Sequence, residues 1–272
     1  MAKPTRALVP QWAPPEGPDG APVLVLGNSL GTTAMVWDSQ IPIFRQHYRV
    51  LSFDLPGHAG SAALPGPYTL EELGSGVLAM LDTLSIERAS YCGVSLGGMI
   101  GMWLASRAPS RITALGLVCT SAHLPPAAGW HSRAARVRVD GLSAISDQVV
   151  NRWFTPAYVA EAPAVPDAFQ IALELTDPEG YAGCCEAIAD MDLRADLGAI
   201  SAPTLVIAGA NDPATPPEHG DAIAECIPGA SLQVIPGAAH LATVSNPDVV
   251  GHALAAHLRA TTGPEQFRRA GR

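Results

Sequence analysis

Residues 91–98 have the sequence Tyr91-Cys92-Gly93-Val94-Ser95-Leu96-Gly97-Gly98. They contain the pattern G-x-S-x-G, placed between an apolar run that ends at Val94 and a helical segment that begins at Leu96. This strand–turn–helix context is typical of a nucleophile elbow, in which a serine lies on a strained turn. Glycines on either side remove the Cβ atoms that would clash in such a turn. We therefore expect the Ser95 hydroxyl at the carboxyl edge of a sheet.

Strand-like and helical segments alternate on both sides of this turn. Short apolar runs predict buried strands over residues 23–26, 49–53, 90–94, 112–119, 204–209 and 231–235. Helical periodicity predicts helices over 70–84, 96–107 and 217–227, and a last helix that starts at Asn246-Pro247. The first of these opens with a capping box formed by Thr69 and Glu72. The alternation predicts an α/β fold with a mostly parallel, doubly wound sheet.

The alternation is interrupted in the middle of the chain. Residues 121–197 contain helical pieces and prolines but no clear strand. We expect a helical cap here, inserted between two segments of one core, residues 1–120 and 198–262. Residues 263–272 are expected to form a flexible tail. The stretch before Gly20 is rich in proline and glycine and is expected to be extended.

Composition excludes several classes of protein. Of the 272 residues, 48% are apolar and 15% are charged, which excludes a disordered chain. The net charge of −9 argues against a nucleic-acid partner. We find neither a signal peptide nor a long apolar run, so we expect a cytoplasmic protein without a membrane partner. The five cysteines show no CxxC spacing and are predicted to be buried apolar side chains. The chain also has no HExxH motif, and we expect neither a metal site nor an organic cofactor.

A serine nucleophile needs a base and a group that orients the base. In the fold expected here these partners follow later strands, in the chain order serine, acid, histidine. Asp212 comes directly after the predicted strand 204–209, and His240 follows the strand 231–235. We predict His240 as the base and Asp212 as its orienting acid. His58 follows the second predicted strand at the same sheet edge and competes with His240 for the role of base.

The reaction of a serine nucleophile also needs donors for the oxyanion that develops. One donor is expected from the backbone N–H of Leu96, the residue after the nucleophile. The second is expected from the loop Gly27 to Gly31, where position favours the N–H of Ser29.

Several segments resemble one family of hydrolases. They are Asn28 to Thr32 (NSLGT), Met35 to Gln40 (MVWDSQ), Tyr91 to Gly98 (YCGVSLGG), Arg152 to Thr155 (RWFT) and Asp212 to Pro216 (DPATP). On these the chain resembles the α/β-hydrolases and, more narrowly, the 3-oxoadipate enol-lactonases of aromatic degradation. The resemblance implies hydrolysis of a small anionic lactone through an acyl-enzyme. The chain departs from the pattern of this family at Pro56 to Ser61 (PGHAGS), where many relatives have R-G-H-G-x-S.

A lactone with a free carboxylate needs a cation in the pocket, and arginine is suited to bidentate binding of carboxylates. All basic residues except Lys3 are arginines, and the predicted cap holds Arg133, Arg136, Arg138 and Arg152. Arg133 follows Trp130 by three positions, so the two share a face of a helix. We predict that Trp130 and Arg133 bind the substrate.

Two further functions are compatible with the same motifs. A general carboxylesterase or perhydrolase would use the same three residues on other esters. A ligand-binding protein on this fold would use the pocket without catalysis. A haloalkane dehalogenase is disfavoured because it needs an aspartate where this chain has Ser95.

Overall fold

The computed structural model describes residues 6–261, and the predicted tail lies outside this range. Within it, seven strands form one sheet in the order β1-β3-β2-β4-β5-β6-β7. Their bounds are β1 Gln11–Trp12, β2 Val23–Gly27, β3 Arg49–Asp54, β4 Ala89–Val94, β5 Ile112–Val118, β6 Thr204–Gly209 and β7 Ser231–Ile235. Strands β2 to β7 pair in parallel, whereas β1 runs antiparallel to β3. The α/β fold predicted from the alternation is confirmed.

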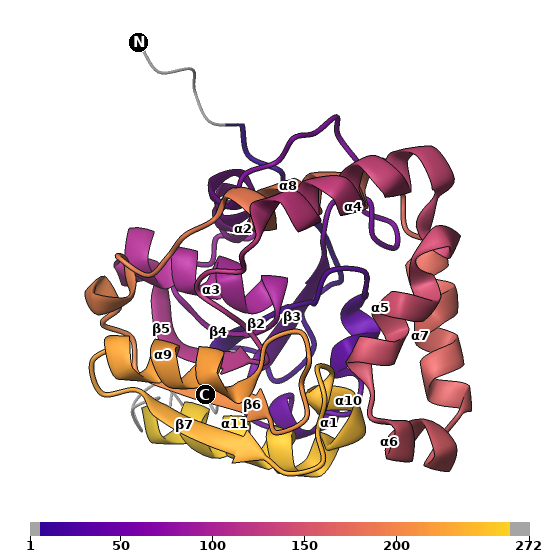
Figure 1. Ribbon diagram of the computed structural model, residues 1–272. Coiled ribbons are helices and arrows are strands. Elements are labelled where there is room, and N and C mark those ends of the chain that lie inside the picture. Colours follow the sequence, from indigo (N-terminus) through magenta and orange to yellow (C-terminus); the bar gives the residue numbers. More distant parts are fainter. Residues whose placement is uncertain (1–5, 262–272) are drawn as a thin grey trace.

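Helices cover both faces of this sheet (Figure 1). Their bounds are α1 Ile41–Phe44, α2 Leu70–Thr83, α3 Leu96–Arg107, α4 Ala127–Asp140, α5 Ser146–Trp153, α6 Pro156–Glu161, α7 Ala164–Glu174, α8 Pro178–Asp190, α9 Pro217–Cys226, α10 Ala242–Ser245 and α11 Pro247–Thr261. Helix α3 packs on β2, β4 and β5, while α11 packs on β5 and β6 from the other face. The capping box of Thr69 and Glu72 at the start of α2 is confirmed.

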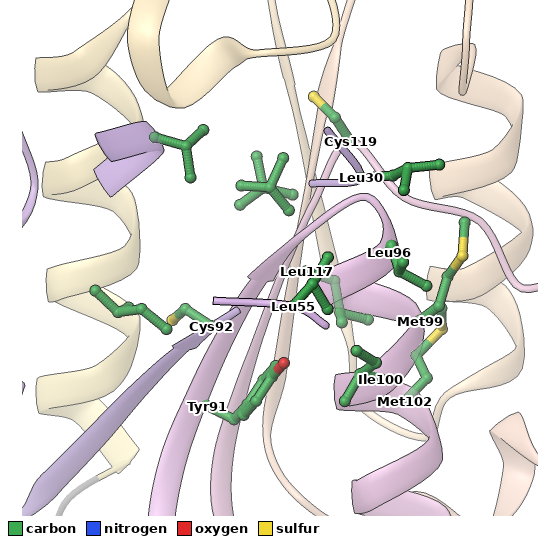
Figure 2. Close-up of a cluster of buried hydrophobic side chains, with 14 of the residues drawn as sticks. Leu30, Leu55, Tyr91, Cys92, Leu96, Met99, Ile100, Met102, Leu117 and Cys119 are labelled. Atoms are coloured by element: carbon green, nitrogen blue, oxygen red, sulfur yellow. The ribbon is translucent and has the colours of Figure 1, made fainter. Parts of the chain in front are cut away.

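The core around β4 shows how apolar side chains support the turn after this strand. Every residue of β4 is buried, so its side chains face helices on both sides. Figure 2 shows Tyr91 and Cys92 projecting from β4 in opposite directions, with Leu96 and Met99 of α3 nearby. The Tyr91 hydroxyl donates a hydrogen bond of 3.0 Å to the Gly97 carbonyl oxygen, in the first turn of α3. Burying each such apolar side chain contributes about 1.5–3 kcal/mol, so the start of α3 is firmly held.

Two differences from the predicted strands have local causes. Strand β1 was not predicted, because two residues are too few to show periodicity. It is defined by tertiary pairing, with Trp12 opposite Phe53. Strand β5 ends at Val118, one residue before the predicted end, because Cys119 has a φ of +45° and leaves the extended conformation.

The helices α4 to α8 follow β5 and precede β6, and we call them the inserted helices. They lie beyond one edge of the sheet, with α4 packed against α8 and α5 against α7 (Figure 1). His123 and Asp192 form an antiparallel bridge where the chain enters and leaves this insertion. The Leu193 N–H also donates a hydrogen bond of 2.9 Å to the Ala122 carbonyl oxygen. The insertion is therefore closed at its base by backbone pairing.

The five cysteines all lie in the described residues and are free. Cys92, Cys119, Cys184 and Cys185 are buried as predicted, but Cys226 is exposed, so the prediction was wrong there. Cys226 is the last residue of α9, where the helix end faces solvent. No helix within residues 6–261 combines the length and apolar character needed to cross a lipid bilayer.

Candidate active site

Ser95 lies on the turn between β4 and α3 with backbone angles of φ +53° and ψ −116°. A positive φ at a residue with a Cβ atom costs about 1–3 kcal/mol and persists only where the surroundings enforce it. A Cβ atom at Gly93 would lie 2.3 Å from the carbonyl carbon of Gly97. One at Gly97 would lie 2.4 Å from the carbonyl carbon of Gly27. The tight turn therefore requires glycine on both sides of the serine, as the sequence pattern predicts.

Two hydrogen bonds, one to β5 and one from a residue just after it, fix this turn. The Ser95 N–H donates to the Val118 carbonyl oxygen at 3.0 Å. The Thr120 hydroxyl donates to the Ser95 carbonyl oxygen at 2.6 Å. The side chain of Ser95 is 7% exposed and opens into a pocket. Its hydroxyl is thus accessible only from one side.

His240 and Asp212 are brought together from loops after two neighbouring strands. The loops follow β6 and β7, and the Asn211 N–H joins them through a hydrogen bond of 2.9 Å to the Ala238 carbonyl oxygen. The distance between His240 Nδ1 and Asp212 Oδ2 is 2.8 Å. Both residues are buried, and His240 and Ser95 line the same pocket. The three residues named from the sequence therefore meet at the carboxyl edge of the sheet.

The Asp212 carboxylate is held by donors from the turn that follows it. Oδ1 accepts hydrogen bonds from the N–H groups of Ala214 and Thr215 at 2.7 Å and 3.1 Å. Oδ2 accepts from the Thr215 hydroxyl at 2.7 Å. Burial by itself raises the pKa of Asp212, but the charge of His240 and the hydrogen bonds from His240 and Thr215 outweigh burial and lower this pKa. Asp212 is therefore the ionised partner of His240.

The two predicted oxyanion donors come from the start of α3 and from the loop after β2. Leu96 is the first residue of α3, so its N–H has no acceptor within the helix. Ser29 lies in the loop after β2 and lines the same pocket as Ser95. The Gly97 N–H ties this loop to α3 by donating to the Asn28 carbonyl oxygen at 2.9 Å.

The pocket itself lies between the carboxyl edge of the sheet and helices α4, α5 and α8. Its wall is mostly apolar, with a few polar groups. The lining residues are Ser29, Leu30, Ser95, Leu124, Trp130, Arg133, Val149, Arg152, Trp153, Tyr181, Ile188, Ala214, Thr215 and His240. The predicted substrate-binding residues Trp130 and Arg133 are thus in the same pocket as Ser95 and His240.

Comparison with known proteins agrees with this architecture. The sequence pattern of the alpha/beta hydrolase fold family matches residues 22–150 and 164–247. This chain belongs to the alpha/beta hydrolase family. A curated relative, 3-oxoadipate enol-lactonase 2 of Acinetobacter baylyi, is 40% identical over 88% of this chain and 89% of its own length.

Solved structures of similar proteins extend the comparison. The enol-lactonase from Burkholderia xenovorans is 38% identical, with a TM-score of 0.89 over 92% of this chain and 96% of the other. A hydrolase from Pseudomonas aeruginosa is 44% identical, with a TM-score of 0.88 over 91% of this chain and 93% of the other. The predicted resemblance to enol-lactonases of the alpha/beta hydrolase family is therefore confirmed.

The arginines of the inserted helices in this hydrolase separate into two groups. Arg136 pairs with Asp140, and Arg138 pairs with Glu179 and Glu186. Arg133 and Arg152 line the pocket instead, and among the described residues neither takes part in an ion pair.

The two pocket arginines are positioned by neighbouring groups. The Arg133 guanidinium lies over the Trp130 ring, 4.7 Å from its centroid, a cation–π arrangement. The Trp130 Nε1–H donates to the Leu124 carbonyl oxygen at 3.0 Å, which orients the ring. Arg152 Nη2 donates to the Pro213 carbonyl oxygen at 3.1 Å. Burial, and then the charge of Arg133, lower the pKa of Arg152, so the pair favours an anion between or beside the two cations.

His58, the alternative base, is placed elsewhere. It is fully buried and is not among the residues that line the pocket. Its two ring nitrogens contact backbone groups, Nε2 with the Gly31 N–H at 2.9 Å and Nδ1 with the Pro56 carbonyl oxygen at 3.0 Å. Neither nitrogen is left to accept a proton from Ser95.

Sequence reasoning overlooked one contributor to this site and did not single out another. Thr215 lies within the DPATP segment, but its hydrogen bond to Asp212 appears only in the folded turn. Arg152 was one of four candidate arginines, and only the position of α5 shows that it reaches the pocket. Across residues 6–261, no group of three or more His, Cys, Asp or Glu side chains is arranged to hold a metal ion.

Proposed function

We propose that this hydrolase opens 3-oxoadipate enol-lactone to 3-oxoadipate, a step in the catabolism of aromatic compounds through protocatechuate. The observation that carries the proposal is that Arg133 and Arg152 lie, without carboxylate partners among the described residues, in the pocket of Ser95 and His240. A free carboxylate on a small apolar lactone complements such a pocket in charge and in polarity. The name of the Acinetobacter baylyi relative, a 3-oxoadipate enol-lactonase, supports this substrate, and that of the Burkholderia xenovorans protein, an enol-lactonase, supports the class of reaction.

The proposed reaction begins with acylation of Ser95. His240 takes the hydroxyl proton as Ser95 Oγ forms a bond to the lactone carbonyl carbon. Asp212, ionised and 2.8 Å from His240 Nδ1, stabilises the imidazolium that forms. The N–H groups of Leu96 and Ser29 donate to the oxyanion of the tetrahedral intermediate.

Collapse of this intermediate breaks the bond between the acyl carbon and the ring oxygen. The departing enolate receives the proton from His240 and becomes a ketone, and the opened chain remains attached to Ser95 as an ester. Water then attacks the ester with His240 as general base, which frees the second carboxylate and restores the serine. Each step balances with water as the co-reactant.

The arginines give a physical reason for specificity. A guanidinium in a partly buried pocket loses hydration, and a carboxylate can replace the lost interactions with two parallel hydrogen bonds. The net charge of the chain is −9, so its overall field repels an anion and a local cationic site is needed. Arg133, held over Trp130, is the first contact that we assign to the substrate carboxylate.

The other candidate functions account for less of the pocket. A general carboxylesterase or perhydrolase would act on neutral esters, and two guanidinium groups without carboxylate partners among the described residues would weaken binding of such substrates in its pocket. A ligand-binding protein would have no use for a serine held at φ +53°, because that conformation costs stability.

The test of the proposed function compares two serine variants on α3 and its preceding turn. Ser95→Ala is expected to lower kcat for the enol-lactone at least about 10⁴-fold. The reaction is monitored by the decrease in the ultraviolet absorbance of the lactone. Ser106→Ala is the matched control, because the Ser106 hydroxyl donates within α3, to the Trp103 carbonyl oxygen. The control is expected to keep wild-type kcat. Full lactonase activity in Ser95→Ala would refute the proposed mechanism.

A further inference from the structure

The buried imidazole of His58 has no part in the proposed reaction, although it lies between two loops at the edge of the sheet. Nε2 accepts a hydrogen bond from the Gly31 N–H at 2.9 Å, so Nε2 carries no proton. Nδ1, 3.0 Å from the Pro56 carbonyl oxygen, must then be the protonated nitrogen. The ring thus joins the loop after β3 to the loop after β2 through one donated and one accepted hydrogen bond.

The loop after β2 needs such support, because it has no regular secondary structure. Gly31 has a φ of +80° and lies two residues after Ser29. Residues on either side of Gly31 are held by hydrogen bonds to the end of β3. Asn28 Nδ2 donates to the Phe53 carbonyl oxygen at 2.8 Å, and the Ala34 N–H donates to Asp54 Oδ1 at 2.9 Å.

The contact from His58 is the central one of this series. It fastens the peptide at Gly31 between the points held through Asn28 and Ala34. Burial, opposed only in part by backbone hydrogen bonds at Pro56 and Leu55, lowers the pKa of His58 to about 4, so the ring is neutral at neutral pH. A neutral ring keeps Nε2 available as an acceptor.

The inserted helices add a second constraint on this histidine. The Tyr181 ring of α8 stacks beside the imidazole, with centroids 6.4 Å apart and planes inclined by 26°. Tyr181 also lines the pocket. The side chain of His58 is therefore held in one orientation from both the core and the inserted helices.

We propose that His58 is a positioning residue that holds the loop after β2 so that the Ser29 N–H faces the oxyanion formed at Ser95. This inference rests on the proposed function, in which Ser29 is an oxyanion donor. It predicts an effect on the transition state and little effect on binding of the ground state, because the carboxylate contacts come from α4 and α5. A displaced donor of this kind lowers kcat by about 10- to 100-fold.

Three substitutions separate the two hydrogen bonds of the ring. The amide of glutamine extends as far as Nε2 and can accept from the Gly31 N–H, whereas the shorter asparagine can replace only Nδ1. We expect His58→Asn and His58→Ala to lower kcat about 10- to 100-fold with KM changed less than about twofold. His58→Gln is expected to recover most of the lost kcat. His257→Asn is the control, since His257 lies on α11 and contacts the Pro203 carbonyl oxygen, away from the loop after β2.

The substrate for this series is p-nitrophenyl acetate, with a trifluoromethyl ketone as a second probe. The ketone forms a tetrahedral adduct with Ser95, and we expect its inhibition constant to rise in parallel with the loss of kcat. A change in KM alone, or equal losses in His58→Gln and His58→Asn, would overturn the proposal. Should the variants fail to fold, nitrogen NMR of the wild type decides, because a proton on His58 Nε2 would exclude the contact with Gly31.

Assays of the wild-type protein on both substrates distinguish a failure of this inference from a failure of the proposed function. Activity of the wild type on p-nitrophenyl acetate without activity on the enol-lactone would overturn the proposed substrate. The role of His58 would then still be decided by the kcat of the His58 variants on p-nitrophenyl acetate. Wild-type kcat in His58→Asn, with the enol-lactone hydrolysed normally, would overturn the role of His58 alone.

Discussion

The Thr215 hydroxyl donates a hydrogen bond of 2.7 Å to Asp212 Oδ2, the same oxygen that lies 2.8 Å from His240 Nδ1. The acid is therefore oriented by a residue three positions later in its own turn. This arrangement fixes the carboxylate plane and leaves only one geometry for the histidine. Thr215 also lines the pocket, and its role can be tested by substitutions that keep the size of its side chain.

Removal of the Thr215 hydroxyl should therefore impair catalysis. Thr215→Val keeps the size of the side chain but leaves Asp212 Oδ2 with one donor fewer, and we expect kcat/KM to fall about tenfold. Thr215→Ser restores the hydroxyl and is expected to stay within about threefold of the wild type. Steady-state kinetics of the two variants provides the measurement. Equal activities of Thr215→Val and the wild type would show that this hydrogen bond is dispensable.

The pocket arginines should determine the preference for anionic substrates. Arg133→Ala and Arg152→Ala are each expected to lower kcat/KM for the anionic lactone by about 10- to 100-fold, mainly through KM. Activity on a neutral aryl ester should change little, because that substrate makes no ion pair. Arg136→Ala on α4 is the control, since its guanidinium contacts Asp140 and the Ala144 carbonyl oxygen. If lactone kinetics survive in Arg133→Ala, the assignment of this residue is wrong.

Acidification should destabilise the protein through His58. The unfolded chain binds a proton at this residue near pH 6.5, whereas the folded protein does so only at a pKa of about 4. Between these values the unfolded state holds more protons, so the free energy of unfolding decreases as the pH falls. The loss amounts to about 3 kcal/mol over that range. Tyr181, whose ring stacks beside His58, stays neutral over this pH range, because burial raises its pKa.

Urea unfolding at pH 7, 5 and 4 measures this contribution. The wild type should lose more stability over the series than His58→Gln, which has no proton to gain at that position. Parallel losses in both proteins would assign the acid sensitivity to other groups.

One departure from the family pattern has a conformational consequence. Ala59 stands where many relatives have glycine, and its φ is +47°. A Cβ atom in this left-handed region costs about 1–2 kcal/mol, whereas glycine adds about 0.5–1 kcal/mol of unfolded-chain entropy. Ala59→Gly is therefore expected to stabilise the protein by about 0.5–1 kcal/mol. Thermal or urea unfolding tests this, and a destabilised variant would contradict it.

The sequence was sufficient where local pattern and strand order determine position. Ser95 could be placed because its glycines and its strand–helix context are local features. Asp212 and His240 could be placed because parallel strands end at one edge of the sheet. These three positions required no knowledge of side-chain contacts.

The remaining parts of the site depend on tertiary contacts. The contact of His58 with Gly31 joins two loops, and the sequence position of His58 offered only a competing candidate for the catalytic base. Only the packing of α5 distinguishes Arg152, which lines the pocket, from Arg138, which pairs with Glu179. Strand β1 is too short for a periodic signal and depends on its pairing with β3.

The most direct test of the account compares two substrates on the wild-type protein. The quantity is the ratio of kcat/KM for 3-oxoadipate enol-lactone to kcat/KM for a neutral aryl ester such as p-nitrophenyl acetate. Because Arg133 and Arg152 line the pocket of Ser95, we predict a ratio of at least about 100 in favour of the lactone. A ratio of one or less would contradict the account and indicate a general esterase.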